Sequence, residues 1–347
     1  MDISKWQWNR IIIIALVILF FFFSAPIYLL VIFALILSML LLSPVKWLER
    51  KMEPFQFSDE NRRNLAVCIS FLVFVLLLIA TFYSVFRPLV REIASFLATL
   101  PEIVADLQMR LLEFLSTNQN QYLALPAKVK DVINQGAEKV FAFTVAQLNS
   151  LLNILFGVGP VLVQAVLIPF LVYYFLRDRE SLLAGTISMF PIRKRDQIEG
   201  LFRESAIMLS RYVQGQLLVC AITGTLVFAG TSLLGVKYPL VLGVLAFLLE
   251  TVPYIGPFLA FIPAVVLGAS VSSELALKVM GFYLFVSFLE NYIIVPKIMG
   301  KVVKTHPIVI LLGMMLAANW FGLIGMMLAV PAMAILRILI QFIWNWR

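Results

Sequence analysis

Two carboxyl groups stand out because each lies in otherwise apolar sequence. Glu250 separates the charge-free stretches 238–249 and 251–273. Glu290 lies in another apolar stretch, shortly before Pro296. An ionised carboxylate at the centre of a bilayer costs about 2.5–3.5 kcal/mol on insertion scales. Each of the two side chains should therefore face a cavity, pair with a cation or stay protonated, which makes both candidates for a proton or cation site.

Simpler interpretations of these residues remain open. Glu250 could cap a helix end near the membrane interface, and Glu290 could be an interfacial anchor near Lys297. Asn291, the next residue, could bind a solute or could hold two helices together by a hydrogen bond.

The residues that follow Glu250 predict a break in a helix. The run ETVPYIGP covers 250–257, and each proline removes a backbone donor and clashes with the preceding turn. Irregular backbone at membrane depth is tolerated only where it is buried or lines a wet cavity. We therefore expect an interrupted or re-entrant element at 239–270, as in secondary transporters. The predicted helix-break and hinge residues are Pro253, Tyr254, Gly256, Pro257, Pro296 and Pro169. Weaker candidates for lining a path are Gln214, Gly215 and Gln216.

The elements that must position these residues are membrane helices. Of the 347 residues, 62% are hydrophobic and 13% are charged, whereas soluble domains average about 45–50% and about 25%. The longest stretches without Asp, Glu, Lys or Arg are 11–45, 64–86, 140–176, 212–236 and 305–336. Since a spanning helix needs about 20 apolar residues, the sequence predicts an all-α polytopic membrane protein with about eight transmembrane helices.

Basic residues flank these stretches and indicate the topology. The formal charge is +8, and the positive-inside rule explains it better than nucleic-acid binding does. We expect both termini and the basic loop 177–211 on the cytoplasmic side. The segment 1–86 should hold three spans, at about 11–24, 26–43 and 65–86. The C-terminal membrane domain should cover 148–347 and end in two helices separated near Asn319 and Trp320.

The segment 87–147 is the one sizeable water-facing part, predicted to be extracytoplasmic and helical. Its apolar residues recur at alternating spacings of four and three, which is a heptad pattern. These residues are Ile93, Leu97, Leu100, Val104, Leu107, Leu111 and Phe114. The pattern fits either an intramolecular helical hairpin, opened by Pro126, or a seam between subunits.

Catalytic chemistry has no support in the sequence. The common signatures of zinc peptidases, serine hydrolases, nucleotide-binding loops and redox dithiols are missing. With one histidine and two cysteines, we expect no metal site, no cofactor, no disulfide framework and no enzyme activity.

Several motifs together resemble one known family. They are PFLVYYFLRD at 169–178, YVQGQLLV at 212–219, ETVPYIGP at 250–257, ENYIIVPKIMG at 290–300 and HPIVILLG at 306–313. In this order they resemble the autoinducer-2 exporter family, also called PerM-type permeases. The resemblance implies a bacterial inner-membrane transporter that is all-helical and homo-oligomeric. The positions that match its motifs are Glu250, Pro253, Tyr254, Gly256, Pro257, Glu290, Asn291 and Pro296, and we expect the transport path beside them.

Three functions remain as hypotheses. The first is a secondary transporter in the lipid bilayer that exports a small polar solute, with autoinducer-2 as the solute that the resemblance suggests. The second is a sodium–proton, or other monovalent cation–proton, antiporter that uses Glu250 and Glu290. The third is a membrane scaffold that transports nothing and recruits partners through 87–147.

Overall fold

A computed structural model describes residues 25–54, 58–117, 159–300 and 307–344, with four single residues between 136 and 146. Within these ranges the chain forms helices and short turns and contains no strand, which confirms the all-α prediction. Five helices are long and apolar enough to cross a membrane: Leu30–Lys51, Asp59–Thr99, Arg195–Leu233, Ser273–Met299 and Gly325–Phe342. The polytopic class is thus confirmed, while the number of spans stays a prediction. The expected first span, 11–24, lies outside the described residues.

The chain divides into two compact units, which we describe separately. The first consists of residues 1–75 and 158–202. Its helices include α2 (Ala25–Lys51), most of α3 (Asp59–Thr81), α7 (Gly159–Arg177) and α8 (Arg179–Ser188). The apolar faces of α2, α3 and α7 share one core, whose buried members include Ala34, Leu41, Val67 and Val172.

Two expectations for the first unit differ from the structure. Helix α2 includes the predicted span 26–43 but continues through Pro44 to Lys51, and Arg50 and Lys51 in its last turn suit the negative end of the helix dipole. Helix α7 runs unbroken through Pro169, because its packing against α2 outweighs one missing hydrogen bond. In the basic region 177–211, α8 and a short 3-10 turn lead directly into α9 (Arg195–Leu233), and its cytoplasmic side stays a prediction.

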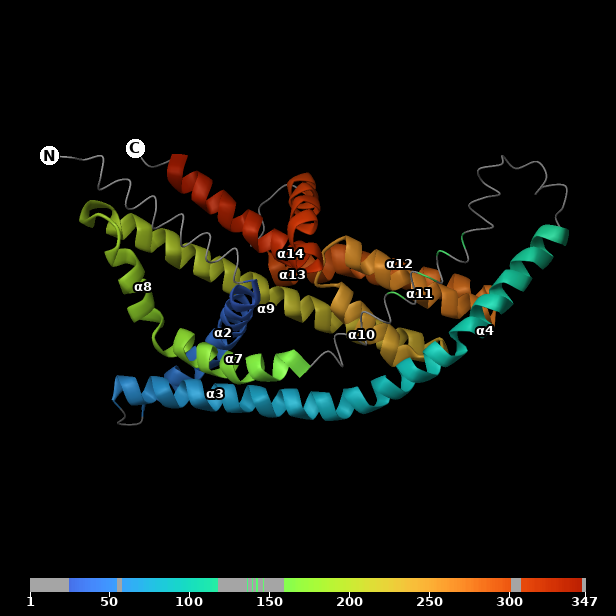
Figure 1. The fold of residues 1–347 in the computed structure, drawn as a ribbon, viewed down its shortest axis with the longest axis horizontal. Helices are drawn as coiled ribbons and strands as arrows, with labels where there is room; N and C mark the ends of the chain where they lie inside the picture. The colour runs from blue at the N-terminus through green and yellow to red at the C-terminus, as the bar shows by residue number, and fades with distance from the viewer. Residues whose placement is uncertain are drawn as a thin grey trace. The chain divides into compact units, whose positions relative to one another are not determined.

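The second unit consists of residues 76–157 and 203–347. Its first helices continue from α3 without interruption, through a π-helical turn at Phe82–Phe86, into α4 (Arg87–Thr117) (Figure 1). The expected boundary between residues 86 and 87 therefore does not coincide with a helix end. The division into 1–86, 87–147 and 148–347 stays a prediction.

Helix α4 packs within its own chain. Leu89, Ile93, Phe96 and Ile103 are buried in a core that they share with α10 (Pro239–Leu249) and α11 (Ile255–Val271). The buried face thus contains the predicted heptad position 93 and packs against the partly buried Leu97, but it also includes Leu89 and Phe96, which the heptad pattern leaves out. The side chains of the later positions, from Leu100 on, and the helix expected after Pro126 lie outside the described residues.

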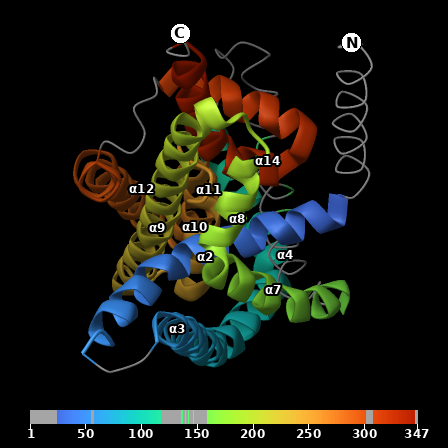
Figure 2. The same ribbon diagram turned by 90° about the vertical axis from the view of Figure 1, so that its left-hand side faces the viewer.

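Helices α9, α10 and α11 lie together in this unit (Figure 2). The backbones of α9 and α10 touch at Gly224 and Gly243, where a Cβ on either glycine would lie 2.9 Å from the carbonyl oxygen of the other. The chain leaves the helical conformation between Leu249 and Ile255, which confirms the predicted interruption within 239–270.

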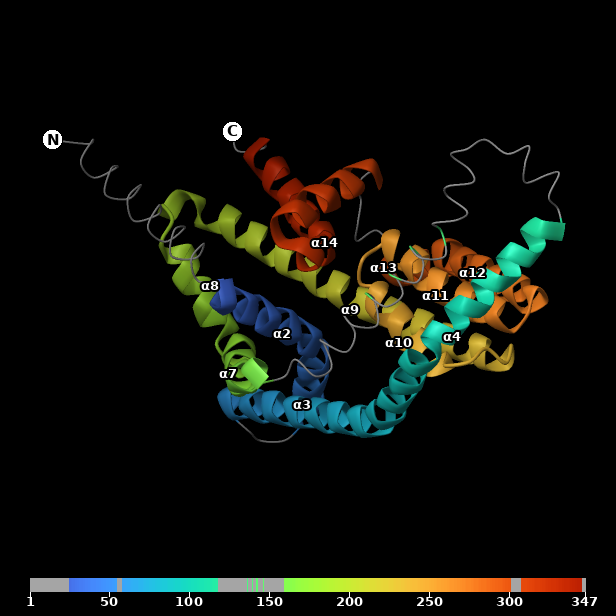
Figure 3. The same cartoon turned by 45° about the vertical axis from the view of Figure 1, so that its right-hand side comes forward.

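The last helices of the unit also depart from regular geometry. Helix α12 (Ser273–Leu289) passes through a π-helical turn at Glu290–Ile294 into α13 (Val295–Met299). Helix α14 (Pro307–Trp344) consists of two arms joined by a kink at Gly322, with φ 58° and ψ −141° (Figure 3). The two predicted helices are confirmed, but the kink lies at Gly322 rather than at Asn319 and Trp320, because only glycine adopts this conformation readily.

Candidate transport cavity

A cavity of about 720 Å³ lies in the second unit beside the break between α10 and α11. Its walls come from α9, from the break itself, and from α11, α12, α13 and α14. The volume lies within the roughly 300–1,000 Å³ that is typical of small-molecule sites. Its polar lining includes Tyr212, Gln216, Glu250, Ser287, Glu290 and Asn291.

The break that opens this cavity is built from residues that cannot continue a helix. Tyr254 has φ 66°, a left-handed value that is costly for a side chain of this size. A Cβ at Gly256 would overlap the carbonyl oxygen of Leu249, so the chain can return past the end of α10 only with glycine there. Pro253 and Pro257 flank this crossing and line the cavity.

The break leaves backbone groups of α10 in need of partners. The N–H of Glu250 still donates to the carbonyl of Ala246 at 2.9 Å. Its carbonyl oxygen accepts a hydrogen bond of 2.7 Å from Nε2 of Gln216 on α9. Gln216, a weak candidate from the sequence, thus supports the backbone at the break and lines the cavity as well.

The other two weak candidates do not share this role. Gln214 donates its side-chain amide to Oγ of Ser210 at 3.3 Å, one turn back on the same helix. Gly215 is where α9 approaches α13, since a Cβ there would lie 2.9 Å from the sulfur of Met299. Of these three residues, the described cavity lining includes Gln216 alone.

Glu250 and Glu290 come together although they are far apart in the sequence. The two residues are 2% and 6% exposed, and their carboxyl groups lie close enough to interact. Within the described part of the chain, Oε2 of Glu250 has no hydrogen-bond partner. Two ionised carboxylates would repel each other here, so the pair should hold a proton or a cation.

Glu290 opens the π-helical turn that precedes Pro296. The N–H of Val295 donates to the carbonyl of Glu290, five residues back instead of four. The extra residue in the turn accommodates Pro296, which has no N–H to donate. The predicted break at Pro296 is therefore a widened turn within a continuous helical run.

Asn291 does not hold two helices together. Its side-chain amide donates to the carbonyl of Ser287 in its own helix, at 2.8 Å. It is exposed and lines the cavity.

Several lining residues were missed by the sequence reasoning. The buried hydroxyl of Tyr212 has no hydrogen-bond partner within the described residues, and that of Tyr283 donates to the carbonyl of Ala260 at 3.4 Å. Helical spacing could have identified two of them, because Tyr283 and Ser287 precede Glu290 by seven and three residues and so lie on the same helix face. Tyr212 likewise lies four residues before Gln216.

Comparison with known proteins identifies the family of the chain. The family model described as "AI-2E family transporter" matches residues 11–345. The chain belongs to the AI-2E transporter family. It is 27% identical over 314 residues to YrrI of Bacillus subtilis (strain 168), which is named as a transport protein. This alignment covers 90% of the present chain and 85% of YrrI. It is 26% identical over 238 residues to PerM of Escherichia coli (strain K12), which is named as a permease, with 67% of each chain covered.

This AI-2E family chain is thus a membrane protein of a transporter and permease family. Among its described residues no group of three or more His, Cys, Asp or Glu side chains could hold a metal ion.

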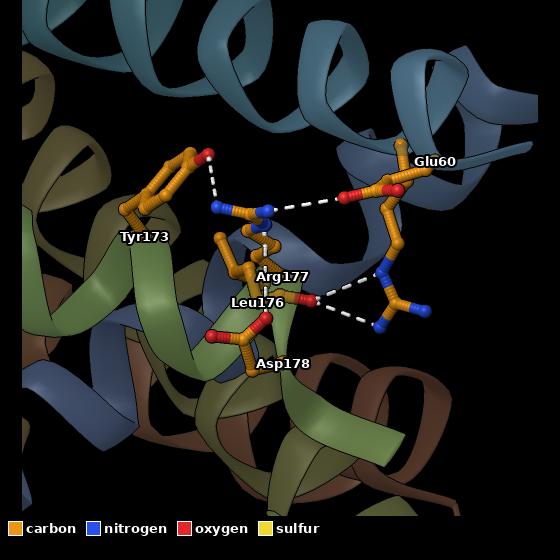
Figure 4. A network of polar contacts seen from close by, with 6 residues as sticks. Glu60, Tyr173, Leu176, Arg177 and Asp178 are labelled. Atoms are coloured by element: carbon orange, nitrogen blue, oxygen red, sulfur yellow. Dashed lines mark hydrogen bonds and ion pairs between the residues drawn. The ribbon is translucent and has the colours of Figure 1, made fainter. Parts of the chain in front are cut away.

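A second polar cluster lies in the first unit of this AI-2E family protein, and Figure 4 shows it. Arg177 approaches Glu60 at 3.1 Å and Asp178 at 3.7 Å. Arg63 donates two hydrogen bonds, of 3.3 and 2.9 Å, to the carbonyl oxygen of Leu176. This network satisfies the end of α7 and ties it to α3, so we assign it a structural role.

Proposed function

We propose that this chain is a secondary transporter that carries a small polar solute through the cavity beside Glu250 and Glu290. One observation carries the proposal: two carboxyl groups are buried side by side where an apolar helix is interrupted. Burying such groups costs free energy that a structural role does not require. A site that binds and releases a solute or a proton gives a reason for their presence.

The family resemblance favours autoinducer-2 as the solute and export as the direction. We also propose that the protein lies in the bacterial inner membrane as a homo-oligomer, with both termini in the cytoplasm. The basic residues that flank the apolar helices support this orientation.

A specific observation favours a second function, monovalent cation–proton antiport. A pair of buried carboxyl groups that holds one proton can release it when a cation such as sodium enters the cavity. The unpartnered Oε2 of Glu250 would then be the first ligand that the cation meets.

The test is flux through the purified protein in liposomes. The panel comprises sodium, protons and small hydroxylated solutes including autoinducer-2, and each is measured with wild type, Glu250→Gln and Glu274→Gln. Glu274 is an acidic residue of α12 outside the cavity lining, where it pairs with Lys278 at 2.6 Å. Sodium-dependent proton flux that is lost only in Glu250→Gln supports antiport. Solute flux without sodium dependence supports export, and no flux of any kind refutes both.

A further inference from the structure

The start of α10 is held by a part of the chain that the transport motifs do not include. We propose that residues 92–99 of α4 form a clamp that fixes α10 and thereby sets the position of Glu250, with Glu92 as a positioning residue. This inference rests on the proposed function of the cavity. Its evidence lies at the opposite end of α10 from the break.

The first N–H groups of α10 have no local cap. Tyr238 precedes the helix with φ 60° and ψ 47°, and its side chain makes no capping bond. Pro239 has no N–H, and the N–H of Leu242 donates to the carbonyl of Tyr238 at 3.2 Å. Two donors at a helix start therefore remain, those of Leu240 and Val241.

Glu92 satisfies both of these donors. Its Oε2 accepts hydrogen bonds of 3.1 Å from the N–H of Leu240 and 3.1 Å from that of Val241. A carboxylate at a helix N-terminus also interacts favourably with the helix dipole. The cap comes from about 150 residues earlier in the chain, so it fixes α10 to α4 as well as completing the helix.

The clamp also contacts Tyr238, the residue before α10. Its hydroxyl lies 2.9 Å from Oγ1 of Thr99 and 3.4 Å from Oγ of Ser95. Its ring stacks on that of Phe96 with centroids 5.1 Å apart. These contacts hold a left-handed tyrosine that is otherwise unfavourable, which indicates that the junction is fixed rather than mobile.

Helix α10 connects the clamp at its first turn with the cavity at its end. A helix of 11 residues is about 16 Å long and moves as a rigid rod. Glu92 holds its first turn, the contact between Gly224 and Gly243 fixes its middle, and Glu250 follows its last residue. Releasing the first turn should therefore displace the Glu250 carboxyl group from Glu290.

The experiment compares Glu92→Ala with Glu102→Ala in the full chain in lipid nanodiscs. Glu102 is an exposed acid on the same helix and serves as the matched control. Hydrogen exchange of the 240–241 amides should speed up about tenfold in Glu92→Ala, the size of a lost helix cap, and stay unchanged in Glu102→Ala. Glu92→Gln keeps one acceptor oxygen and should restore part of the protection.

A second measurement reports on the two carboxyl groups of the cavity and does not depend on transport. Dicyclohexylcarbodiimide modifies protonated carboxyl groups in apolar surroundings, and mass spectrometry gives its rate at Glu250 and Glu290. Glu92→Ala should change this rate several-fold with no change in the control. Tyr238→Phe removes only the hydroxyl contacts and should shift both readouts in the same direction by less, which keeps the test decisive if Glu92→Ala fails to fold.

Two results would overturn the proposal. Unchanged exchange in Glu92→Ala would mean that the clamp does not hold α10. Faster exchange with unchanged labelling and unchanged flux would mean that α10 is held but does not position the cavity. If wild type carries no flux while exchange and labelling respond as expected, the transport function fails and the clamp stands.

Discussion

Two groups of acidic side chains, one in each unit, lie in contrasting environments. In the first, Glu60 and Glu180 are 72% and 81% exposed and each lies within 4.0 Å of an arginine, Arg177 and Arg63 respectively. In the second, Glu250 and Glu290 are almost fully buried and face each other. The first arrangement pairs acids with bases at a surface, and the second pairs acid with acid at an interrupted helix.

The energetics of the two arrangements differ accordingly. Exposed ion pairs contribute little to stability, because water and salt screen them. A buried acid pair destabilises the fold unless a proton or another ion joins it. A sequence change should therefore alter function more strongly at the cavity than in the network around Arg177. Three predictions test this difference, and the largest effect comes first.

Substitution of the carboxyl pair should have the largest effect. Glu250→Gln and Glu290→Gln should each lower proton-coupled flux by about a hundredfold or more, the scale for loss of a proton-transfer group. The double variant should lose little more than either single variant, because residues that act as a unit are not additive. Flux into liposomes measures all three.

Independent behaviour of the two residues would contradict this prediction. If the two losses multiply in the double variant, each glutamate acts alone and the proximity of the two carboxyl groups has no functional meaning. Thermal unfolding of the three variants gives the control for folding.

Gly256→Ala should have the next largest effect. The added methyl group overlaps the carbonyl oxygen of Leu249, so the break must shift, and we expect a loss of about 1–3 kcal/mol in the free energy of unfolding. Gly281→Ala is the control, because nothing lies within 4 Å of a Cβ there, and alanine in a helix should be neutral or stabilising. Equal stability of the two variants would show that the crossing at Gly256 is not tight.

Arg177→Gln should have the smallest effect. The ion pairs with Glu60 and Asp178 are exposed, so flux should stay within about a factor of two of wild type. Any decrease in unfolding temperature should shrink at about 1 M salt, where the screening length is about 3 Å. A loss of flux as large as that of Glu250→Gln would remove the distinction between the two clusters.

Much of the fold could be predicted because apolar run length and helix breakers are local signals. Charge-free stretches identified the membrane helices, and Pro253, Gly256 and Pro257 identified the interruption. Proline alone was a poorer guide. Pro169 and Pro296 lie within continuous helical runs, since neighbouring packing or a widened turn absorbs the lost hydrogen bond.

The site was predictable only in part because its contacts are long-range. Sequence identified Glu250 and Glu290 separately, but nothing local shows that the two side chains meet. Tyr212 joins the cavity from a third helix. Glu92 looks like an ordinary charged residue of a water-facing segment, and its role depends on a helix that begins far away in the sequence.

The lining of the cavity also limits what can enter it. Of the side chains that line it in the described part of the chain, none is a lysine, arginine or histidine. Among these described side chains a phosphate ester or an organic acid would meet two carboxyl groups, and like charges repel each other in a buried site. A screen for ligands of this protein should therefore begin with uncharged and positively charged compounds.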